Sequence, residues 1–286
     1  MGIRNNCPAC CGYEQQQCFE VNGFDIKRCL ACGTLYVEKL PILEELASIY
    51  TNGSYYELSD ESLQRITEEN QRRLKLIKRI KPQGRFLDIG CAQGLLLDEA
   101  KKNGYQTFGV EPTLKNAEEA ARKGHVVESK MLDEYVKQCG DDRFDVIACL
   151  DVIEHVENPK EFLMLASSLL MDDGLMVIST PNYSCIVEKR LGANAPYMTP
   201  PEHVTFFTVE GMRHLVVTCG LDVVGLHTFG NLISAEMDRS IRRYLPKPLY
   251  PFSGLIKPIV RFSFGLLNLM KMGLEQEIYL KKAKKR

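Results

Sequence analysis

Phe86-Leu-Asp-Ile-Gly-Cys-Ala-Gln-Gly94 is an apolar run that ends in an acidic residue and a turn marked by two glycines. This pattern is typical of a buried strand that passes into a helix at the carboxyl edge of a parallel sheet. Gly90 and Gly94 would let the backbone approach a ligand, and Asp88 would offer a carboxylate to an amine or an ordered water. The spacing does not match G-x-G-x-x-G, so the turn alone does not indicate a dinucleotide.

On both sides of this turn, apolar runs alternate with segments long enough for helices. The strand-like runs are 85–89, 105–110, 125–128, 144–150 and 175–180, and the helical stretches are 95–103, 113–123 and 160–170. Such alternation predicts an α/β fold with a mostly parallel sheet covered on both faces and ligands at the carboxyl ends of the strands. Two further strands are expected at 221–229 and 275–282.

The second predicted strand ends in Gly109-Val-Glu111-Pro112, about 20 residues after the first turn. An acidic residue at this position can accept hydrogen bonds from both hydroxyls of a ribose. A nucleoside that lacks a pyrophosphate, held by a glycine turn and one carboxylate, fits S-adenosylmethionine better than a dinucleotide. The run from Phe144 to Pro159 adds a polar cluster at the same edge.

Residues 84 to about 228 resemble class I S-adenosylmethionine-dependent methyltransferases that share the succession D-x-G-C-x-x-G, G-x-E-P, D-V-x-E-H-V-x-x-P and T-P-N. All four motifs occur here in order, at Asp88–Gly94, Gly109–Pro112, Asp151–Pro159 and Thr180–Asn182. The resemblance implies a Rossmann-like domain with a mixed, mostly parallel seven-stranded sheet, and S-adenosylmethionine as methyl donor. Ala92 stands where the family often has glycine, and its single methyl group is expected to be tolerated.

The resemblance also implies donor-binding roles for individual residues. It places Asp88, Gly90 and Gly94 at the methionine end, Glu111 at the ribose, Leu132 near the adenine, and Asp151 facing the donor or the acceptor, and it counts Cys91 among the cofactor-binding residues. The alternative for the three acidic residues is solvation at a strand end.

Six of the eleven cysteines lie in the first 32 residues. Cys7-Pro-Ala-Cys10 and Cys29-Leu-Ala-Cys32 form two C-x2-C pairs, which can place four thiolates about 2.3 Å from a zinc ion with a hairpin between the pairs. So short a module cannot build an adequate core, and zinc would supply its folding energy. The sequence therefore predicts a structural zinc ribbon over residues 1–40. Cys11 is an alternative to Cys10 as ligand, and a redox dithiol is the alternative function.

Methyl transfer to a hydroxyl or an acidic carbon also needs a base. Pro200-Pro-Glu202-His203-Val-Thr-Phe-Phe-Thr208 follows the fifth strand, where such enzymes place acceptor-binding elements. His203, beside Glu202, is one candidate base. With the cysteine pairs, this segment is partly similar to sugar C-methyltransferases. His155 is the second candidate, because Glu154-His155 resembles the pair in quinone O-methyltransferases, where it could position a divalent metal.

Each of these histidines also has a structural alternative. His203 could cap or pack a helix, and the Glu154-His155 pair could cap the following loop. His214 is expected at the surface of a helix, and no role is expected for His125 or His227.

Charge and composition divide the rest of the chain. Glu236 to Arg286 holds 12 basic and 4 acidic residues, which leaves 24 basic and 33 acidic residues before it. Residues 41–83 are expected to form a helical cap, 84–230 the methyltransferase domain, and 275–286 the last strand and a basic tail. Bases interleaved with apolar residues over 239–271 predict an amphipathic helical insert (231–274) that contacts anionic lipid, covers the acceptor or forms a homodimer.

These observations predict a cytoplasmic enzyme that methylates oxygen or carbon of a small-molecule or lipid-linked acceptor, with no specific nucleic-acid partner. One alternative is an RNA methyltransferase that grips its substrate with the ribbon. The acidic balance of residues 1–235 and the missing N-P-P-[YF] signature weaken it. The other is a non-catalytic nucleotide-binding scaffold, against which the intact set of Asp88, Gly90, Gly94 and Glu111 argues.

Overall fold

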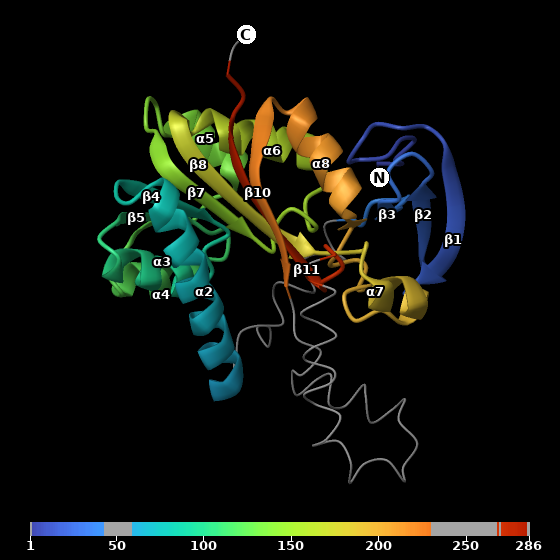
Figure 1. Cartoon of the computed structure of the whole chain (residues 1–286), viewed down its shortest axis with the longest axis horizontal. Helices are drawn as coiled ribbons and strands as arrows, with labels where there is room; N and C mark the ends of the chain where they lie inside the picture. Colours follow the sequence, from blue (N-terminus) through green and yellow to red (C-terminus); the bar gives the residue numbers. More distant parts are fainter. Residues whose placement is uncertain (1, 43–58, 230–267, 269, 285–286) are drawn as a thin grey trace, which may run out of the picture.

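A seven-stranded sheet lies at the centre of the computed structural model, which describes residues 2–42, 59–229, 268 and 270–284 (Figure 1). The strand order is β10-β11-β8-β7-β4-β5-β6, and β11 runs antiparallel to both neighbours while the pairs from β8 to β6 are parallel. The strands are β4 (Arg85–Ile89), β5 (Gln106–Val110), β6 (Val126–Glu128), β7 (Phe144–Leu150), β8 (Leu170–Pro181), β10 (Leu221–Phe229) and β11 (Glu275–Lys282). The predicted mixed, mostly parallel sheet is confirmed.

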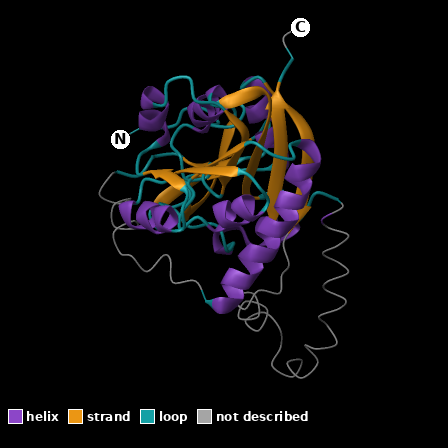
Figure 2. Cartoon of the chain, turned by 90° about the vertical axis from the view of Figure 1, so that its left-hand side faces the viewer, coloured by secondary structure: helices purple, strands orange, loops and turns teal. Residues whose placement is uncertain are grey.

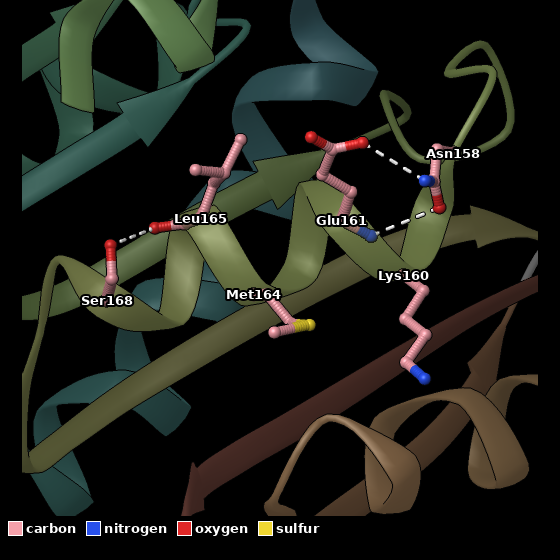
Figure 3. A pocket seen from close by; sticks show the side chains of 6 residues that line it. All are labelled: Asn158, Lys160, Glu161, Met164, Leu165 and Ser168. Carbon is pink, nitrogen blue, oxygen red and sulfur yellow. Dashed lines mark hydrogen bonds between the residues drawn. The ribbon is translucent and has the colours of Figure 1, made fainter. Parts of the chain in front are cut away.

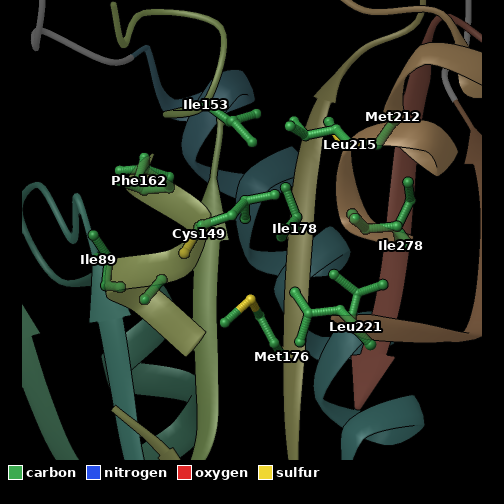
Figure 4. Close-up of a cluster of buried hydrophobic side chains, with 14 of the residues drawn as sticks. Ile89, Cys149, Ile153, Phe162, Met176, Ile178, Met212, Leu215, Leu221 and Ile278 are labelled. Carbon is green, nitrogen blue, oxygen red and sulfur yellow. The ribbon is translucent and has the colours of Figure 1, made fainter. Parts of the chain in front are cut away.

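Helices cover both faces of this sheet, as Figures 1 and 2 show. One hydrophobic core joins the sheet to α5 (Leu132–Gln138), α6 (Pro159–Ser168) and α8 (Val209–Thr218), and a second joins it to α2 (Asp60–Ile80), α3 (Leu95–Lys102) and α4 (Leu114–Arg122). In the first core, Cys149 and Ile178 of the strands pack with Phe162 and Leu215 of the helices (Figure 4). Burial on both faces explains why the central strands are continuous apolar runs.

Helix α2 accounts for the described part of the helical cap expected before the sheet. Ser59 caps its first turn by accepting a hydrogen bond from the Ser62 backbone at 3.3 Å. Ile77 packs into the second core, and Arg73 forms a 2.6 Å ion pair with Glu277 of β11. Glu277 is fully buried, and the pKa of its carboxyl is lowered by the two neighbouring guanidinium groups against the effect of burial.

The amino-terminal residues form a separate sheet in the order β1-β2-β3-β9. Its strands are β1 (Gln15–Val21), β2 (Phe24–Cys29), β3 (Leu35–Val37) and β9 (Thr205–Phe206). The predicted hairpin between the cysteine pairs is β1–β2. The fourth strand comes from the segment after β8, with Leu35 opposite Phe206. Helix α7 (Ile186–Leu191) and the turn η2 (Gly192–Asn194) lie between β8 and β9 and beside the ribbon (Figure 1).

The basic insert predicted over 231–274 lies almost wholly outside the described residues, as do residues 43–58 of the expected cap. Its helices and its contacts therefore stay predictions. In the part of the chain that the structure describes, no helix is both long and apolar enough to cross a membrane.

Candidate active site and zinc centre

The turn after β4 requires glycine at two positions. Gly90 has φ of +77°, and a Cβ atom there would lie 2.5 Å from the Val152 side chain. Gly94 has φ of +81° where α3 begins, and a Cβ atom there would lie 3.0 Å from Ala120. Left-handed backbone and close packing both exclude a side chain at these two positions, so the turn needs glycine at each.

Ala92 lies between these glycines. Its methyl group was expected to be tolerated, but the backbone conformation at this position is unfavourable for any residue with a Cβ atom. Its φ is +44°, in the left-handed region that costs about 1–2 kcal/mol for a residue with a Cβ atom. The cost therefore lies in the backbone rather than in the volume of the methyl group. The conformation directs the Ala92 N–H to the Glu111 Oε2 atom at 3.0 Å.

Glu111 lies directly after β5 and is 5% exposed. Its Oε2 atom accepts the Ala92 N–H, and its Oε1 atom accepts the Thr113 N–H at 2.9 Å. Each carboxylate oxygen can accept two hydrogen bonds, so each keeps capacity for one more. A fixed carboxylate with this spare capacity suits the two hydroxyls of a ribose.

The Asp88 side chain is buried, with the residue 4% exposed, and its carboxyl forms no hydrogen bond with any described residue. Burial raises the pKa of its carboxyl to about 8; the Arg73 charge opposes this rise and the Glu111 charge adds to it. A buried carboxyl without a hydrogen-bond partner is costly, and a ligand ammonium group would remove the cost. The two carboxylates and the glycine turn thus fit the amine and the ribose of S-adenosylmethionine.

Cys91, Leu132 and Asp151 were also predicted to bind the donor, and the surroundings of their side chains differ. The Cys91 side chain is buried in the second core, where its sulfur packs against Gly109, so only its backbone can face a ligand. Leu132 starts α5 and is 7% exposed, within the first core. Asp151 follows β7, is exposed with φ of +54°, and accepts a hydrogen bond from Ser179 Oγ at 2.9 Å.

The two histidines that sequence presented as competing bases form one pair. The rings of His155 and His203 have centroids 4.6 Å apart at an interplanar angle of 76°. His155 Nδ1 lies 2.9 Å from the Glu202 carbonyl oxygen, and His203 Nδ1 lies 2.8 Å from that of Tyr197. Carbonyl oxygens only accept, so both Nδ1 atoms carry the proton and both Nε2 atoms keep a lone pair when the rings are neutral.

Burial keeps both rings neutral at pH 7. It lowers the pKa of His155, and burial together with the neighbouring His155 lowers the pKa of His203 to about 4. Neutral imidazole is the form that accepts a proton or binds a metal, so both rings can do either at pH 7.

Glu154 completes a cluster with the two imidazoles. It is 2% exposed, accepts a hydrogen bond from Thr180 Oγ1 at 3.0 Å, and burial raises the pKa of its carboxyl well above the usual range. One ligand atom from each of the three residues lies within 4.8 Å of the other two. Two imidazoles and one carboxylate are also a donor set that could hold a divalent cation.

Glu202, predicted to assist His203, instead supports His155 through its backbone carbonyl. Its Oε1 atom is buried and has no hydrogen-bond partner among the described residues. Of the two histidines given no role, His125 lies between Thr107 Oγ1 at 2.8 Å and Asp98 Oδ1 at 3.0 Å, and the His227 ring packs edge-on against Tyr279. His214 pairs with Glu210 at 3.3 Å on the exposed surface of α8.

Four cysteine sulfurs converge at the end of the ribbon. Cys7 Sγ lies 3.6 Å from Cys32 Sγ, and Cys10 Sγ lies 3.4 Å from Cys29 Sγ. A tetrahedron with zinc–sulfur distances of about 2.3 Å has edges of roughly 3.8 Å, so these four thiols fit zinc. Cys11, the alternative ligand, is exposed with φ of +61° and lies outside the cluster.

The ribbon is joined to both histidine segments through Arg4, a residue that no sequence pattern singled out. Its Nη1 atom donates to the Val204 carbonyl oxygen at 2.7 Å, next to His203, and its Nη2 atom donates to that of Glu157 at 2.6 Å, two residues after His155. Arg4 is 8% exposed, and burial lowers the pKa of its guanidinium to about 10. The ribbon therefore fixes the spacing of the two segments.

Replacing Arg4 by methionine is expected to lower the free energy of unfolding by about 3 kcal/mol or more, because the buried Val204 carbonyl oxygen and the partly buried Glu157 carbonyl oxygen lose a charged donor. Urea denaturation of the zinc-loaded protein measures this loss. Arg190→Met, at an exposed position of α7, is the matched control and is expected to change stability by less than about 0.5 kcal/mol. Equal stability of the two variants would show that Arg4 does not join the ribbon to the domain.

A hollow of about 410 Å³ lies along α6, and none of the four cysteines or of the predicted donor-binding and base residues lines it (Figure 3). Apart from Lys160, its polar side chains have partners: Asn158 Nδ2 donates to Glu161 Oε2 at 3.0 Å, and Ser168 Oγ donates to the Leu165 carbonyl oxygen at 2.7 Å. With these partners in place, the hollow offers little for ligand recognition.

Comparison with known proteins identifies the family. A family profile described as a methyltransferase domain matches residues 61–226, more than half of the chain. The chain belongs to this methyltransferase family. The match includes the glycine turn, Glu111 and the His155–His203 pair, so the residues assembled here lie inside the methyltransferase domain.

Curated relatives of this methyltransferase match over a limited stretch. Ubiquinone biosynthesis O-methyltransferases of Rhodopseudomonas palustris (strain BisA53) and Bradyrhizobium diazoefficiens are 35% and 38% identical over 103 residues. Each match covers 34% of this chain and 40% of the relative. The chain thus spans less than half the length of the curated relatives it matches.

Solved structures confirm the class I methyltransferase fold. A SAM-dependent methyltransferase from Archaeoglobus fulgidus has a TM-score of 0.55 at 22% identity, covering 80% of this chain and all of that one. The plantazolicin methyltransferase BpumL, solved with SAH, has a TM-score of 0.51 at 15% identity, covering 84% and 90%. At these identities the likeness shows the fold alone.

Proposed function

We propose that this methyltransferase transfers the methyl group of S-adenosylmethionine to oxygen or carbon of a small-molecule or lipid-linked acceptor. The observation that carries the proposal is the placement of Asp88 and Glu111 at the ends of neighbouring strands, beside the turn of Gly90 and Gly94. When bound, S-adenosylmethionine supplies an electrophilic methyl group on a sulfonium. Asp88 would hold its amine and Glu111 its ribose hydroxyls.

The His155–His203 pair would receive the acceptor's proton. Both rings are anchored through Nδ1 to backbone carbonyl oxygens, so their Nε2 lone pairs are held ready without a change of tautomer. Burial makes both nitrogens weak bases, which suits an acceptor with an acidic proton, such as a phenol, better than an aliphatic alcohol. The names of the curated ubiquinone relatives support O-methylation of such an acceptor.

Replacing His203 by alanine is expected to lower the turnover number by about 10²–10⁴-fold, the usual contribution of a positioned base. The dissociation constant of S-adenosylmethionine should stay within about twofold, because His203 lies on the acceptor side. Radiolabelled methyl transfer to a panel of phenolic and deoxysugar acceptors measures the first quantity, and calorimetry measures the second.

His214→Ala is the control for this experiment, because that histidine is exposed on α8 and pairs only with Glu210 among the described residues. It should leave turnover unchanged. Full activity in His203→Ala would remove the proposed base, and a loss confined to donor affinity would move His203 to the donor site.

The donor set of Glu154, His155 and His203 supports a second role for the same cluster, as a site for a divalent cation. These residues would bind the ion and thereby lower the pKa of an acceptor hydroxyl nearby. Calorimetric titration of the zinc-loaded protein with Mg²⁺ or Mn²⁺, repeated with Glu154→Gln, tests this role independently of turnover. Equal heats in both proteins would exclude it.

The ribbon's packing against the domain, rather than a free basic face, supports a structural role for it and not the RNA alternative. We also propose that residues 239–271 contact anionic lipid or a second copy of the chain, and that the protein is cytoplasmic. Tight binding to bulk RNA that weakens steeply as salt rises would favour the RNA alternative and overturn the structural role of the ribbon.

A further inference from the structure

A second cavity, of about 360 Å³, lies between the zinc ribbon and α7, apart from the carboxylates assigned to the methyl donor. Phe19 and Leu35 line it from the ribbon, and Tyr183, Glu188 and Met198 line it from the domain. Its volume lies in the range of small-molecule sites and is many times that of one water molecule. The cavity exists only where the ribbon and the domain meet.

Two of the residues that line this cavity carry buried polar groups that lack partners within the described residues. Glu188 is 2% exposed, and both of its carboxylate oxygens are buried without a hydrogen bond from any described residue. Tyr183 is 4% exposed, and its hydroxyl group is likewise buried and unpartnered within the described ranges. Native proteins rarely leave such groups unsatisfied, and here both belong to residues in the wall of one cavity.

Two residues in the wall of the cavity adjoin the segment that carries the proposed base. Met198, in its wall, follows Tyr197, whose carbonyl oxygen holds the His203 ring. The Tyr183 ring packs edge-on against Phe206, with centroids 5.0 Å apart, in the segment that follows His203. Burial, the Glu188 charge and then the Glu154 charge raise the pKa of the Tyr183 hydroxyl.

We infer that this cavity binds a ring compound with several hydroxyl groups, as the part of the methyl acceptor remote from the reacting atom. The inference rests on the proposed function. A ring hydroxyl would donate to Glu188, a second would pair with the Tyr183 hydroxyl, and the ring would lie against the apolar side chains of Phe19, Leu35 and Met198. The carboxyl accepts hydrogen bonds whether or not it carries a proton.

Ligand-observed NMR on the zinc-loaded full chain tests the inference with two probes, catechol as a phenolic ring diol and methyl glucoside as a sugar. Binding of one probe and not the other identifies the source of the hydroxyls. The binding probe should lose about tenfold or more in affinity with Glu188→Gln and with Tyr183→Phe, since each removes one hydrogen-bonding partner. Tyr183→Phe also covers the case in which Glu188→Gln fails to fold.

Glu118→Gln, the same substitution at an exposed site on α4, is the matched control and should leave binding unchanged. The inference fails if neither probe binds, or if both variants bind the probe as tightly as the parent protein. Calorimetry with S-adenosylmethionine on the same samples separates this failure from failure of the proposed function. Donor binding without diol binding overturns only the cavity assignment, whereas diol binding without donor binding overturns the methyltransferase proposal.

Discussion

Glu111→Ala is expected to weaken S-adenosylmethionine binding by about 100-fold or more, a loss that calorimetry would record as absent heat at micromolar donor. The carboxylate would give up two charged hydrogen bonds to the ribose, each worth about 1.5–3 kcal/mol. The backbone N–H groups of Ala92 and Thr113 would also lose their acceptor, which loosens the turn that faces the donor.

The control for this experiment is Glu128→Ala, because Glu128 ends the adjacent strand β6 and its side chain is exposed. It is expected to bind S-adenosylmethionine like the parent protein. Unchanged affinity in Glu111→Ala would remove the ribose assignment, and an equal loss in both variants would attribute the effect to the net charge of this edge.

Cys29→Ser is expected to reduce the metal content from about one zinc per chain to nearly none. Zinc binding contributes on the order of 10 kcal/mol or more to the folding of such modules, so three remaining thiolates should not hold the ribbon together. Because the ribbon supplies Arg4 and pairs with β9, methyl transfer should be lost with the metal even though the donor residues lie elsewhere.

The matched control is Cys11→Ser, since Cys11 is an exposed thiol adjacent to a predicted ligand but outside the cluster of four sulfurs. Plasma emission spectroscopy for zinc and circular dichroism for folding give the two readouts. A folded, metal-free parent protein would refute the ribbon, and loss of zinc from Cys11→Ser alone would reassign the ligand.

Local patterns predicted most of the sheet. The strands at Leu221–Phe229 and Glu275–Lys282 have the bounds that sequence gave them, since each is a short run between clear breaks. The glycine turn after β4 was also predictable, because glycine spacing and a strand-end acid are local features, whereas donor binding by this turn stays a prediction. The backbone strain at Ala92 was not, because the sequence does not report φ.

Contacts between distant segments could not be predicted. His155 and His203 looked like competing bases because they lie on separate segments, and only the fold brings their rings together. Arg4 and Glu188 are single charged residues without a motif, and their burial depends on how the ribbon packs against the domain. Each of these misses concerns a partner far away along the chain, about which periodicity carries no information.

The antiparallel pairing of Leu35 with Phe206 has a consequence for biosynthesis. Strands β1 to β3 leave the ribosome well before β9 is translated, and at about 5–20 residues per second the delay is on the order of 10–30 s. During that interval the outer edge of β3 is unpaired, and nascent chains on one messenger could associate through it. Early zinc capture would hold the first three strands in shape until their fourth arrives.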